Sequence, residues 1–411
     1  MDSAFRFFVG IDWAWEEHTI CIINREGKIL KETVIPHSSA GIAQLRDLLG
    51  ELEDAPASVA VAIETPRGSL VEALVEQQYA VFFLNPRQMD RFRDRHTMAG
   101  SKDDRFDALV LADSLRTDAV LFHRVRLDDA ALLRLRELSR TEQEIHRDQR
   151  RTQNQLTALL NRYFPSLLKL CPGADEPWLW DVLEKTPLPQ QAATWSKANL
   201  EKLLQKRRIR RFSAESLWQN LQTPPLPLAP GAADAASEHV CWLLPRLQIL
   251  HQQSKQVAQR VEDLLEQMSK PSDPNKHRDA EILLSLPGLG RVTGATMLTE
   301  GGQALADQDY HALRSLAGTA PVTRRSGKSK FVLMRRSCNP RLRQGLYNYA
   351  MCSIKEDQRS KQLYAALRAR GHSHARALRG VADRLLAVMI AMLRSGTLYD
   401  PNRRAAGASH S

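Results

Sequence analysis

The first third of the chain carries a succession of apolar runs that few folds can accommodate. Three β-rich runs, Phe5–Asp12, His18–Asn24 and Lys28–Ile35, follow one another, and Glu26-Gly27 separates the last two. Short β-rich runs divided by turn residues predict three antiparallel strands joined in sequence. The N-terminal part of the chain is therefore predicted to form a β-sheet.

The next segments alternate between helix and strand patterns. Gly41–Leu52 has the spacing of an amphipathic helix, and Ser58–Ile63 and Ala80–Leu84 are continuous apolar runs typical of buried strands. Gly100–Arg116 ends the series with apolar residues at helical spacing. Three strands followed by helix, strand, helix, strand and helix is the order of a ribonuclease-H-like (RuvC-like) α/β domain, which we expect over residues 1–125.

Carboxylates stand at the ends of these elements. Asp12 and Glu64 each close a predicted strand, and Asp103, Asp104 and Asp107 lie at the mouth of the last helix. Residues three or four apart share a helix face, and two carboxylates about 5 Å apart repel by about 3 kcal/mol at an effective dielectric near 20. A divalent cation between them would turn this repulsion into attraction. Acidic residues also favour the first helical turn because of the helix dipole, and periodicity alone supports both interpretations equally.

The residues around these carboxylates resemble a known family. Asp12 in GIDWAWEEH, Glu64 in AIETPRG, and Asp104 with Asp107 in SKDDRFDA resemble the four-carboxylate (DEDD) signature of insertion-sequence transposases related to the Piv DNA invertase. Holliday-junction resolvases of the RuvC type have a similar carboxylate pattern. The family usually has Lys-Thr-Asp before the last Asp, whereas Lys102 is followed here by Asp103 and Asp104. Spacing favours Asp104 as the ligand, with Asp103 as the alternative. The resemblance implies Mg²⁺ or Mn²⁺ held by Asp12, Glu64, Asp104 and Asp107.

Composition favours a polyanionic partner and a reducing compartment. The 411 residues include 58 Lys and Arg against 47 Asp and Glu, a formal net charge of +11, which suits nucleic acid. The five cysteines are scattered without a CxxC pair, so neither disulfides nor a zinc site is predicted. No signal peptide precedes the first strand, and Leu385–Leu393 is too short to span a bilayer. We therefore expect a soluble cytoplasmic protein, associated with the bacterial nucleoid and not with membranes.

Two long helical patterns occupy the middle of the chain. Asp128–Phe164 has a sparse apolar seam, and a denser one runs from Val240 to Met268. Such helices can form an antiparallel coiled-coil hairpin or pair with a second subunit, and packing as ordinary bundle helices is about as compatible with the periodicity. Pro245 should kink or start the second helix. The resemblance favours an arm used in assembly, within residues 126–275.

The segment Pro165–Ser237 lies between these helices and is harder to interpret. It holds a basic cluster, Lys206–Arg211, and a Pro-rich segment, Thr223–Gly231, that has the composition of a linker. The cluster could contact phosphates or form a solvated helix face. We expect an insertion on the arm, and a second linker, Ser269–Asn275, before a mainly α-helical C-terminal domain over residues 276–411.

The C-terminal domain carries further motifs of the same family. Leu284–Met297 contains a Pro-Gly-x-Gly turn between apolar helical patterns, which resembles a helix-hairpin-helix, although a plain αα-turn fits too. Leu316–Gly327 resembles the Gly-x-x-Pro…Ser-Gly stretch that completes the family signature. The similarity continues through Asn339–Arg343 and the Arg370–Ala377 region.

Ser326 lies in the most basic stretch of the sequence. Between Pro321 and Leu346 there is no acidic residue, so this stretch should gather phosphates and bind nucleic acid. The basic residues there are Arg324, Arg325, Lys328, Lys330, Arg335, Arg336, Arg341 and Arg343. A lone Ser-Gly is usually only a turn, but the family resemblance implies that Ser326 is the nucleophile, in a loop where Gly327 lets a backbone approach closely.

The combined prediction is a DNA transposase or site-specific recombinase of a mobile element. Mg²⁺-assisted phosphoryl transfer would form a transient phosphoserine link at Ser326, and the carboxylates Asp12, Glu64, Asp104 and Asp107 would complete the catalytic set. The resemblance further implies donor and target DNA, a structured guide (bridge) RNA, and a dimer or tetramer. Two alternatives stay open: a metal-dependent DEDD nuclease or Holliday-junction resolvase without a covalent intermediate, and a non-catalytic nucleic-acid-binding relative.

Overall fold

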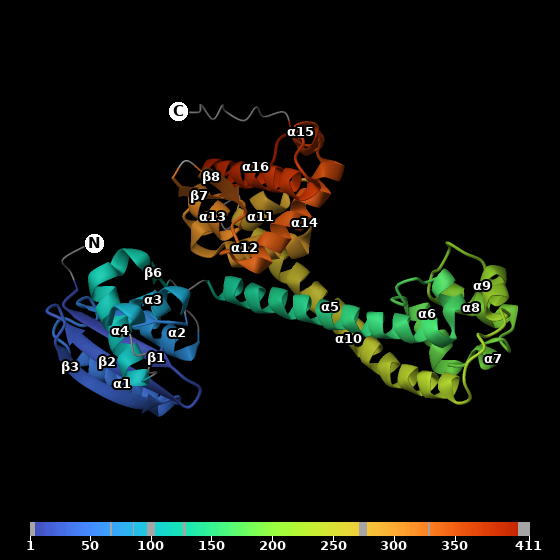
Figure 1. Cartoon of the computed structure of the whole chain (residues 1–411), viewed down its shortest axis with the longest axis horizontal. Helices are drawn as coiled ribbons and strands as arrows, with labels where there is room; N and C mark the ends of the chain where they lie inside the picture. Colours follow the sequence, from blue (N-terminus) through green and yellow to red (C-terminus); the bar gives the residue numbers. More distant parts are fainter. Residues whose placement is uncertain are drawn as a thin grey trace. The chain divides into compact units, whose positions relative to one another are not determined.

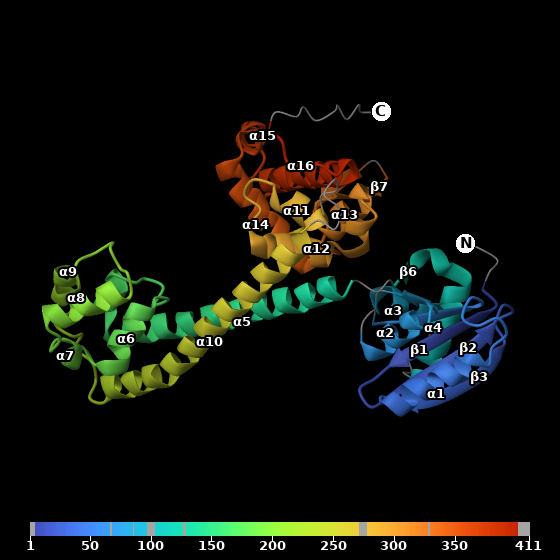
Figure 2. The ribbon, with the colours of Figure 1, turned by 180° about the vertical axis from the view of Figure 1, so that it is seen from behind.

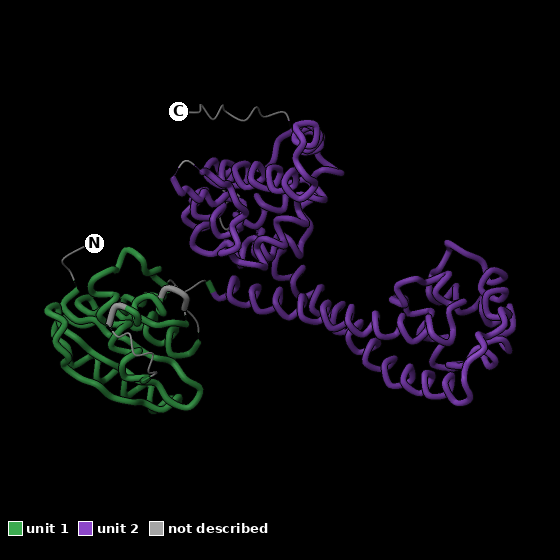
Figure 3. The backbone as a smooth tube through the Cα atoms, viewed as in Figure 1, with its two compact units in different colours: residues 1–129 green, residues 130–411 purple. Residues whose placement is uncertain are grey.

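The protein consists of two compact units in the computed structural model, residues 1–129 and 130–411 (Figure 3). Because the placement of the units relative to each other is not determined, each is described by itself. The residues that the structure describes are 5–65, 68–84, 86–96, 103–125, 129–270, 278–327 and 329–401. Lys102, Lys328 and most of the predicted linker Ser269–Asn275 lie outside this set.

The first unit is built on a six-stranded sheet with the order β3-β2-β1-β4-β5-β6. Strands β1, β2 and β3 pair antiparallel, β4 and β5 join β1 in a parallel arrangement, and β6 returns antiparallel to β5. The elements are β1 Phe7–Trp13, β2 Glu17–Asn24, β3 Ile29–Pro36, α1 Ser39–Gly50, β4 Val59–Ile63, α2 Ser69–Glu76, β5 Ala80–Phe83, α3 Pro86–His96, α4 Asp104–Asp118, the 3-10 turn Ala119–Leu121 and β6 His123–Arg124.

Helices cover both faces of this sheet (Figures 1 and 2). Val9 and Ile11 of β1 pack with α1 and α2, whereas Phe8 packs in a second core with α3 and α4. Successive side chains of a strand point to opposite faces, so even-numbered positions of β1 and β4 face α3 and α4. Asp12 and Glu64 fall on that face.

The predicted α/β order of the first unit is found, with two additions. Each of the five predicted strands lies within two residues of its expected bounds, and the sheet is compatible with a ribonuclease-H-like domain. Helix α3 and the short strand β6 were not predicted. Helix α3 has little apolar content in its sequence, and among its described side chains only Met89 and Phe92 pack into the core.

The second unit is almost entirely helical. Its elements are α5 Ala130–Tyr163, the 3-10 helix Pro165–Lys169, α6 Pro177–Lys185, α7 Pro189–Ala192, α8 Lys197–Lys206, α9 Ala214–Leu221, α10 Ala232–Ser269, α11 Asp279–Leu284, α12 Arg291–Ala306, α13 Tyr310–Leu316, β7 Val322–Ser326, β8 Ser329–Leu333, α14 Pro340–Glu356, α15 Gln358–Ala369 and α16 His374–Ser395. Among the described residues no helix is long and apolar enough to cross a membrane.

Helices α5 and α10 pack against each other in antiparallel directions and join two hydrophobic cores (Figure 1). Leu135 of α5 lies with Val261 and Leu264 of α10 in the core of α11–α16. At the other end, Leu156 lies with Val240 in a core built from α6, α8 and α9. We call α5 and α10 the arm, and the helices α6–α9 the arm end.

Polar residues interrupt the arm between its two cores. Glu142 and Thr152 of α5 are buried there, and burial raises the pKa of the Glu142 carboxyl group. Pro245 lies inside α10, so the expectation that it could start this helix is wrong. Its preceding residues from Ala232 already belong to the same helix.

The segment predicted to be an insertion is a small helical subdomain. Trp178 and Trp180 of α6 are fully buried in its core, while the Pro-rich segment 223–230 has no helix or strand. The basic cluster Lys206–Arg211 begins at the last residue of α8 and continues into the connection to α9. It is therefore not a solvated helix face, the alternative considered from the sequence.

Candidate active site

Asp12 and Glu64 lie side by side at one end of the sheet. The parallel register of β1 and β4 pairs Ile11 with Ile63, and the two acids are the next residue on each strand. The sequences of β1 and β4 are continuous apolar runs because both strands are buried on both faces. The first unit therefore directs two carboxylates to one place.

A glycine brings the third and fourth carboxylates to the same place. A Cβ at Gly10 would overlap the carbonyl oxygen of Ala108 and lie 2.7 Å from the amide nitrogen of Ala112. Only glycine lets α4 lie this close to β1. Asp104 and Asp107, in the first turn of α4, are held against the end of β1 in this way.

The electrostatics of Asp12 reflect the three other carboxylates in its neighbourhood. Burial, followed by the negative charges of Asp107, Asp104 and Glu64, raises the pKa of Asp12 from 3.8 to about 6. Arg93 opposes these effects. A carboxylate whose ionisation is resisted by three others lies in the field that a bound cation would neutralise.

Arg93 of α3 is part of the site, and sequence reasoning missed it. Its Nε and Nη2 donate to the two carboxylate oxygens of Asp107 at 2.5 and 2.7 Å, and its Nη2 lies 4.0 Å from Glu64 Oε1. Asp107 is 7% exposed, so this bidentate pair satisfies a nearly buried carboxylate. No sequence signal marks Arg93, because it is one of four arginines in a polar helix.

Asp103 and Asp104 have different positions in the structure. Asp103 is the N-cap of α4, and its carboxylate accepts a hydrogen bond from the amide of Arg105 at 3.1 Å. Asp104 is the first helical residue, and its charge acts on Asp12. Asp103 therefore has a structural role as a helix cap, and Asp104 as the metal ligand stays a prediction.

The donor set fits a hard divalent cation. Four carboxyl groups offer only oxygen ligands, which Mg²⁺ and Mn²⁺ prefer. Among the described residues no three of these carboxyl groups have ligand oxygens all within 4.8 Å of one another. The Arg93 guanidinium between Asp107 and Glu64 supplies positive charge to the cluster.

A tighter group of possible ligands has another explanation. Cys171, Asp175 and Glu176 have ligand atoms within 4.8 Å of one another. Burial raises the pKa of the Cys171 thiol to about 11, and Cys171 Sγ donates to Asp175 Oδ1 at 3.6 Å. Glu176 accepts a hydrogen bond from Trp178 Nε1 and pairs with Arg211 at 2.6 Å. These bonds, and a thiol whose raised pKa disfavours the thiolate that a metal would need, indicate that the group stabilises the fold of the arm end.

Ser326 lies at the turn of a β-hairpin and not in the expected loop. It is the last residue of β7 and pairs with Ser329 of β8, and Gly327 in the turn has a φ of +55°. Two-residue hairpin turns require positive φ, which glycine adopts without strain. Ser326 is exposed. The hairpin escaped prediction because nearly all of its residues are exposed on both faces.

The predicted basic residues divide into two groups. Arg324, Arg325, Lys330 and Arg336 are exposed around the hairpin. The others are held more closely: Arg341 lies 3.6 Å from Glu144, Arg335 Nε donates to the carbonyl of Ala320 at 3.4 Å, and Arg343 donates to Cys338 Sγ at 3.5 Å.

A buried polar network anchors the chain just after the hairpin. Asn339 caps α14 by accepting hydrogen bonds from the amides of Arg341 and Leu342, and it donates to Glu300 Oε2 at 2.8 Å. Arg140 of the arm donates to Glu300 Oε1 at 3.0 Å. Burial alone would raise the pKa of Glu300, but these hydrogen bonds outweigh it and lower the pKa.

The Pro-Gly-x-Gly motif forms the turn between α11 and α12. Gly288 has a φ of +78°, and a Cβ there would lie 2.9 Å from the amide of Ser353 in α14. This glycine is therefore required by packing inside the unit. A phosphate contact at this turn stays a prediction.

Comparison with known proteins places these two sites in one family. A family profile described as Transposase, for the DEDD transposases of IS110, matches residues 9–165, and one described as Transposase IS116/IS110/IS902 family matches residues 280–365. The mini-circle IS117 protein of Streptomyces coelicolor, which is named as a transposase, is 33% identical over 98% of this chain and 97% of its own. This chain belongs to the IS110 family of transposases.

Two further proteins are similar to this chain, one over nearly its whole length and the other over half of it. The insertion element IS110 protein of Streptomyces coelicolor is 28% identical over 96% of this chain and 95% of its own. A protein of Sinorhizobium fredii that is named as a transposase is 40% identical over 50% of this chain. The two family profiles include the acidic cluster and the Ser326 hairpin, and neither includes the arm end.

Proposed function

We propose that this transposase cuts and rejoins DNA through a covalent bond between Ser326 and a DNA phosphate. The observation that carries the proposal is an exposed serine at the turn of a hairpin that also exposes Arg324, Arg325 and Lys330. No carboxylate lies between residues 321 and 346. Cationic side chains attract the phosphate and stabilise charge that develops on it.

The proposed step transfers a DNA phosphoryl group from a deoxyribose oxygen to Ser326 Oγ. Ser326 Oγ attacks the phosphorus, its proton leaves to a carboxylate of the acidic cluster, and one phosphorus–oxygen bond to deoxyribose breaks. The released sugar oxygen takes up a proton and becomes a hydroxyl group. The phosphoserine diester conserves the energy of the broken phosphodiester bond. The hydroxyl group of another DNA end can therefore attack it, release Ser326 and join the two DNA ends. The cluster could come from the same chain or from a partner subunit.

The acidic cluster has its own part in this proposal. Asp12, Glu64, Asp104 and Asp107 would hold Mg²⁺ or Mn²⁺, and the bound ion would supply Lewis-acid stabilisation of the phosphate. Arg93 balances the charge of Asp107 in the structure, so its guanidinium group and the ion would compete for that carboxylate. The raised pKa of Asp12 and the oxygen-only donor set support this assignment.

Assembly and guidance belong to the proposal through the family. The antiparallel arm of α5 and α10 would act as a coiled coil in a dimer or tetramer, and a structured guide RNA would select donor and target DNA. Exposed basic residues in both parts of the second unit support contact with nucleic acid. The division into domains at residues 125 and 275 belongs to the same proposal.

A suicide substrate tests the serine mechanism. DNA nicked so that the cut fragment diffuses away should leave the wild-type protein covalently attached to DNA. Ser326→Ala should bind the DNA and form no adduct. Ser329→Ala is the matched control, because Ser329 is exposed and lies opposite Ser326 in the hairpin. It should form the adduct at the wild-type rate.

The opposite result would favour the nuclease alternative. The acidic cluster is complete within the first unit, so it could activate water without Ser326. Cleavage by Ser326→Ala at the wild-type rate, with no protein–DNA adduct in any variant, would identify the protein as a metal-dependent nuclease or resolvase.

A further inference from the structure

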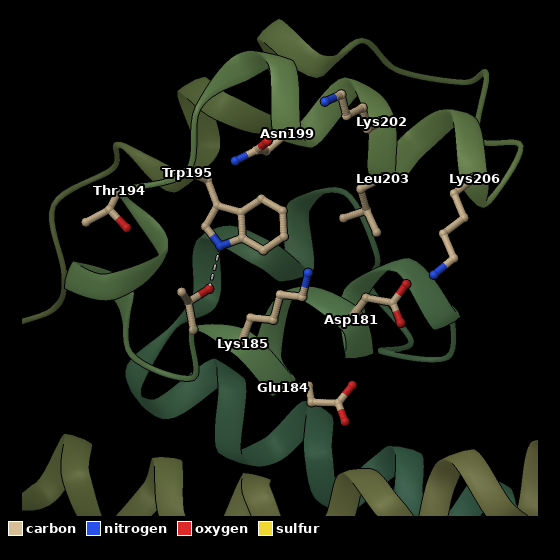
Figure 4. A pocket seen from close by; sticks show the side chains of 10 residues that line it. Asp181, Glu184, Lys185, Thr194, Trp195, Asn199, Lys202, Leu203 and Lys206 are labelled. Carbon is tan, nitrogen blue, oxygen red and sulfur yellow. Dashed lines mark hydrogen bonds between the residues drawn. The ribbon is translucent and has the colours of Figure 1, made fainter.

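The arm end contains a pocket that belongs to neither catalytic site. Its volume is about 620 Å³, and it lies between α6, the connection after α7, and α8 (Figure 4). This size is within the range of roughly 300–1,000 Å³ found for ligand sites. The side chains that matter for its chemistry are Lys185, Trp195, Asn199, Lys202, Leu203 and Lys206.

Positive charge dominates this pocket. Lys185, Lys202 and Lys206 are exposed and form no ion pair within segment 129–270, which is described throughout. The two acids in the lining are engaged elsewhere. Both oxygens of Asp181 accept hydrogen bonds from Arg207 at 2.6 Å, and Glu184 accepts one from Gln248 at 3.3 Å. Three ammonium groups are therefore available to an anion.

One wall of the pocket is a fixed aromatic ring. Trp195 Nε1 donates to Thr186 Oγ1 at 2.8 Å (Figure 4). The Thr186 hydroxyl in turn donates to the carbonyl of Val182 at 3.0 Å. These bonds tie the indole to the end of α6. Lys185 Nζ lies 5.5 Å from the ring centre, and the exposed amide of Asn199 lines the same space.

A nucleotide is the ligand that matches all of these features. Its phosphate suits the ammonium groups, its base can stack on an indole, and an amide can hydrogen-bond to a base edge. A simple anion would leave the aromatic wall unused, and an apolar ligand would leave three charges uncompensated. The pocket combines both parts of the chemistry that single-stranded nucleic acid requires.

The chain around the pocket favours a strand over a free nucleotide. Arg208 and Arg210 follow α8 directly, are exposed, and form no ion pair within the same segment. They continue the basic surface beyond Lys206, so phosphates of neighbouring nucleotides would meet further cations. We propose that the arm-end pocket binds one nucleotide of an unpaired nucleic-acid strand, with its base on Trp195 and its phosphates on Lys202 and Lys206. The proposal rests on the proposed function only for the polymeric nature of the ligand.

Salt-dependent binding tests the charge component. The probes are fluorescein-labelled 12-mers of uridine and of thymidine, and the protein is the full chain. The logarithm of the binding constant falls as the logarithm of the salt concentration rises. Lys202→Gln/Lys206→Gln should make this dependence less steep by about 1.4, because each single-strand phosphate contact contributes about 0.7 to the steepness. If the variant and wild type bind equally at 1 M salt, that change corresponds to about 25-fold weaker binding at 0.1 M salt.

A matched control carries the same loss of charge outside the pocket. Lys169→Gln/Lys255→Gln removes two exposed lysines of the same unit that do not line the pocket. It should change binding by less than about threefold. Equal slopes for the two double variants would overturn the proposal.

Photo-cross-linking tests the position of the base. Strands with one 5-iodouracil should cross-link to Trp195, which is the only aromatic residue of the tryptic peptide 186–197, and Trp195→Leu should lose this adduct. Comparing ribose and deoxyribose strands shows which nucleic acid the pocket prefers. Absence of the 186–197 adduct with both strands would refute the proposal. If the pocket proposal fails in this way, the proposed catalytic function can still hold. Formation of the Ser326–DNA adduct by the Lys202→Gln/Lys206→Gln variant would show that it does.

Discussion

At the scale of residues, the acidic cluster is held together against its own repulsion. Asp12 is surrounded by three carboxylates, and Arg93 is the cation that the structure places among them. Packing of α4 on Gly10 enforces the arrangement. Repulsion among the carboxylates lowers the free energy of unfolding, and removing or neutralising one of these negative charges should restore it.

Asp12→Asn should therefore stabilise the metal-free protein near pH 7.5. The pKa of Asp12 rises from 3.8 to about 6 on folding, so stability falls as pH increases through this window and stays lower above it. Removing the charge should restore on the order of 2 kcal/mol at pH 7.5, after allowance for solvent screening. Thermal unfolding in EDTA at pH 7.5 and pH 4 measures the effect.

The comparison at pH 4 is the internal control. At pH 4 Asp12 is mostly protonated in the folded wild-type protein, so Asp12→Asn should be little more stable than wild type. Mg²⁺ should raise the melting temperature of wild type and have less effect on Asp12→Asn. An equal gain at both pH values would show that Asp12 does not lie in a field of other carboxylates.

Arg93→Gln should have the opposite effect in the metal-free protein. Asp107 would lose two short hydrogen bonds while nearly buried, at a cost of about 2 kcal/mol. Mg²⁺ should then stabilise the variant more than wild type, because no guanidinium competes with it. Melting curves with and without Mg²⁺ give both quantities. Arg91→Gln, an exposed position on α3, is the control; a Mg²⁺ effect equal in both variants would exclude competition.

At the scale of elements, the Ser326 hairpin depends on the network behind it. Asn339 fixes the start of α14 and contacts Glu300, while Asp383 of α16 accepts from Arg314 at 3.0 and 2.8 Å just before β7. The hairpin itself exposes Phe331 and Val332 by 61% and 62%. Its position is thus set by its two ends more than by its own packing.

Replacement of Asn339 tests this support. Asn339→Ala removes an N-cap and should cost about 1–2 kcal/mol. Asn339→Asp keeps the cap but sets a carboxylate against Glu300, so the loss at pH 7 should shrink as pH falls to 4. Denaturant unfolding at both pH values distinguishes the variants. If Asn339→Asp lowers the free energy of unfolding equally at pH 7 and pH 4, the contact with Glu300 does not contribute to stability.

The elements also show what the sequence could and could not predict. Strands β1, β4 and β5 are buried on both faces, so their apolar runs are unbroken, and Asp12 and Glu64 stand out at the strand ends. Met89 and Phe92 are the apolar side chains that helix α3 buries within the part of the chain that the structure describes, and two such residues leave no visible periodicity. The contact of Arg93 with Asp107 arises from tertiary packing and has no local signal. The pocket of the arm end likewise joins residues of α6, a turn and α8.

At the scale of the whole molecule, the two units have separate cores. The first unit buries its apolar residues on the two faces of its own sheet, and the second unit has a core at each end of the arm. Expressed separately, residues 1–129 and 130–411 should each unfold cooperatively, within a few degrees of the transitions of the full chain. Calorimetry of the three proteins tests this, and lack of a cooperative transition for residues 1–129 would contradict it.

The arm also sets the spacing between the two cores of the second unit. Leu135 in one core and Leu156 in the other are roughly 20 residues apart on one helix, a rise of about 30 Å. That interval matches roughly nine base pairs of duplex at 3.4 Å each. Because buried Glu142 and Thr152, and not a third core, occupy the interval, added or deleted helical turns would change this spacing without disturbing either end. The length of α5 and α10 is therefore a dimension that mutation can adjust independently of stability at either core.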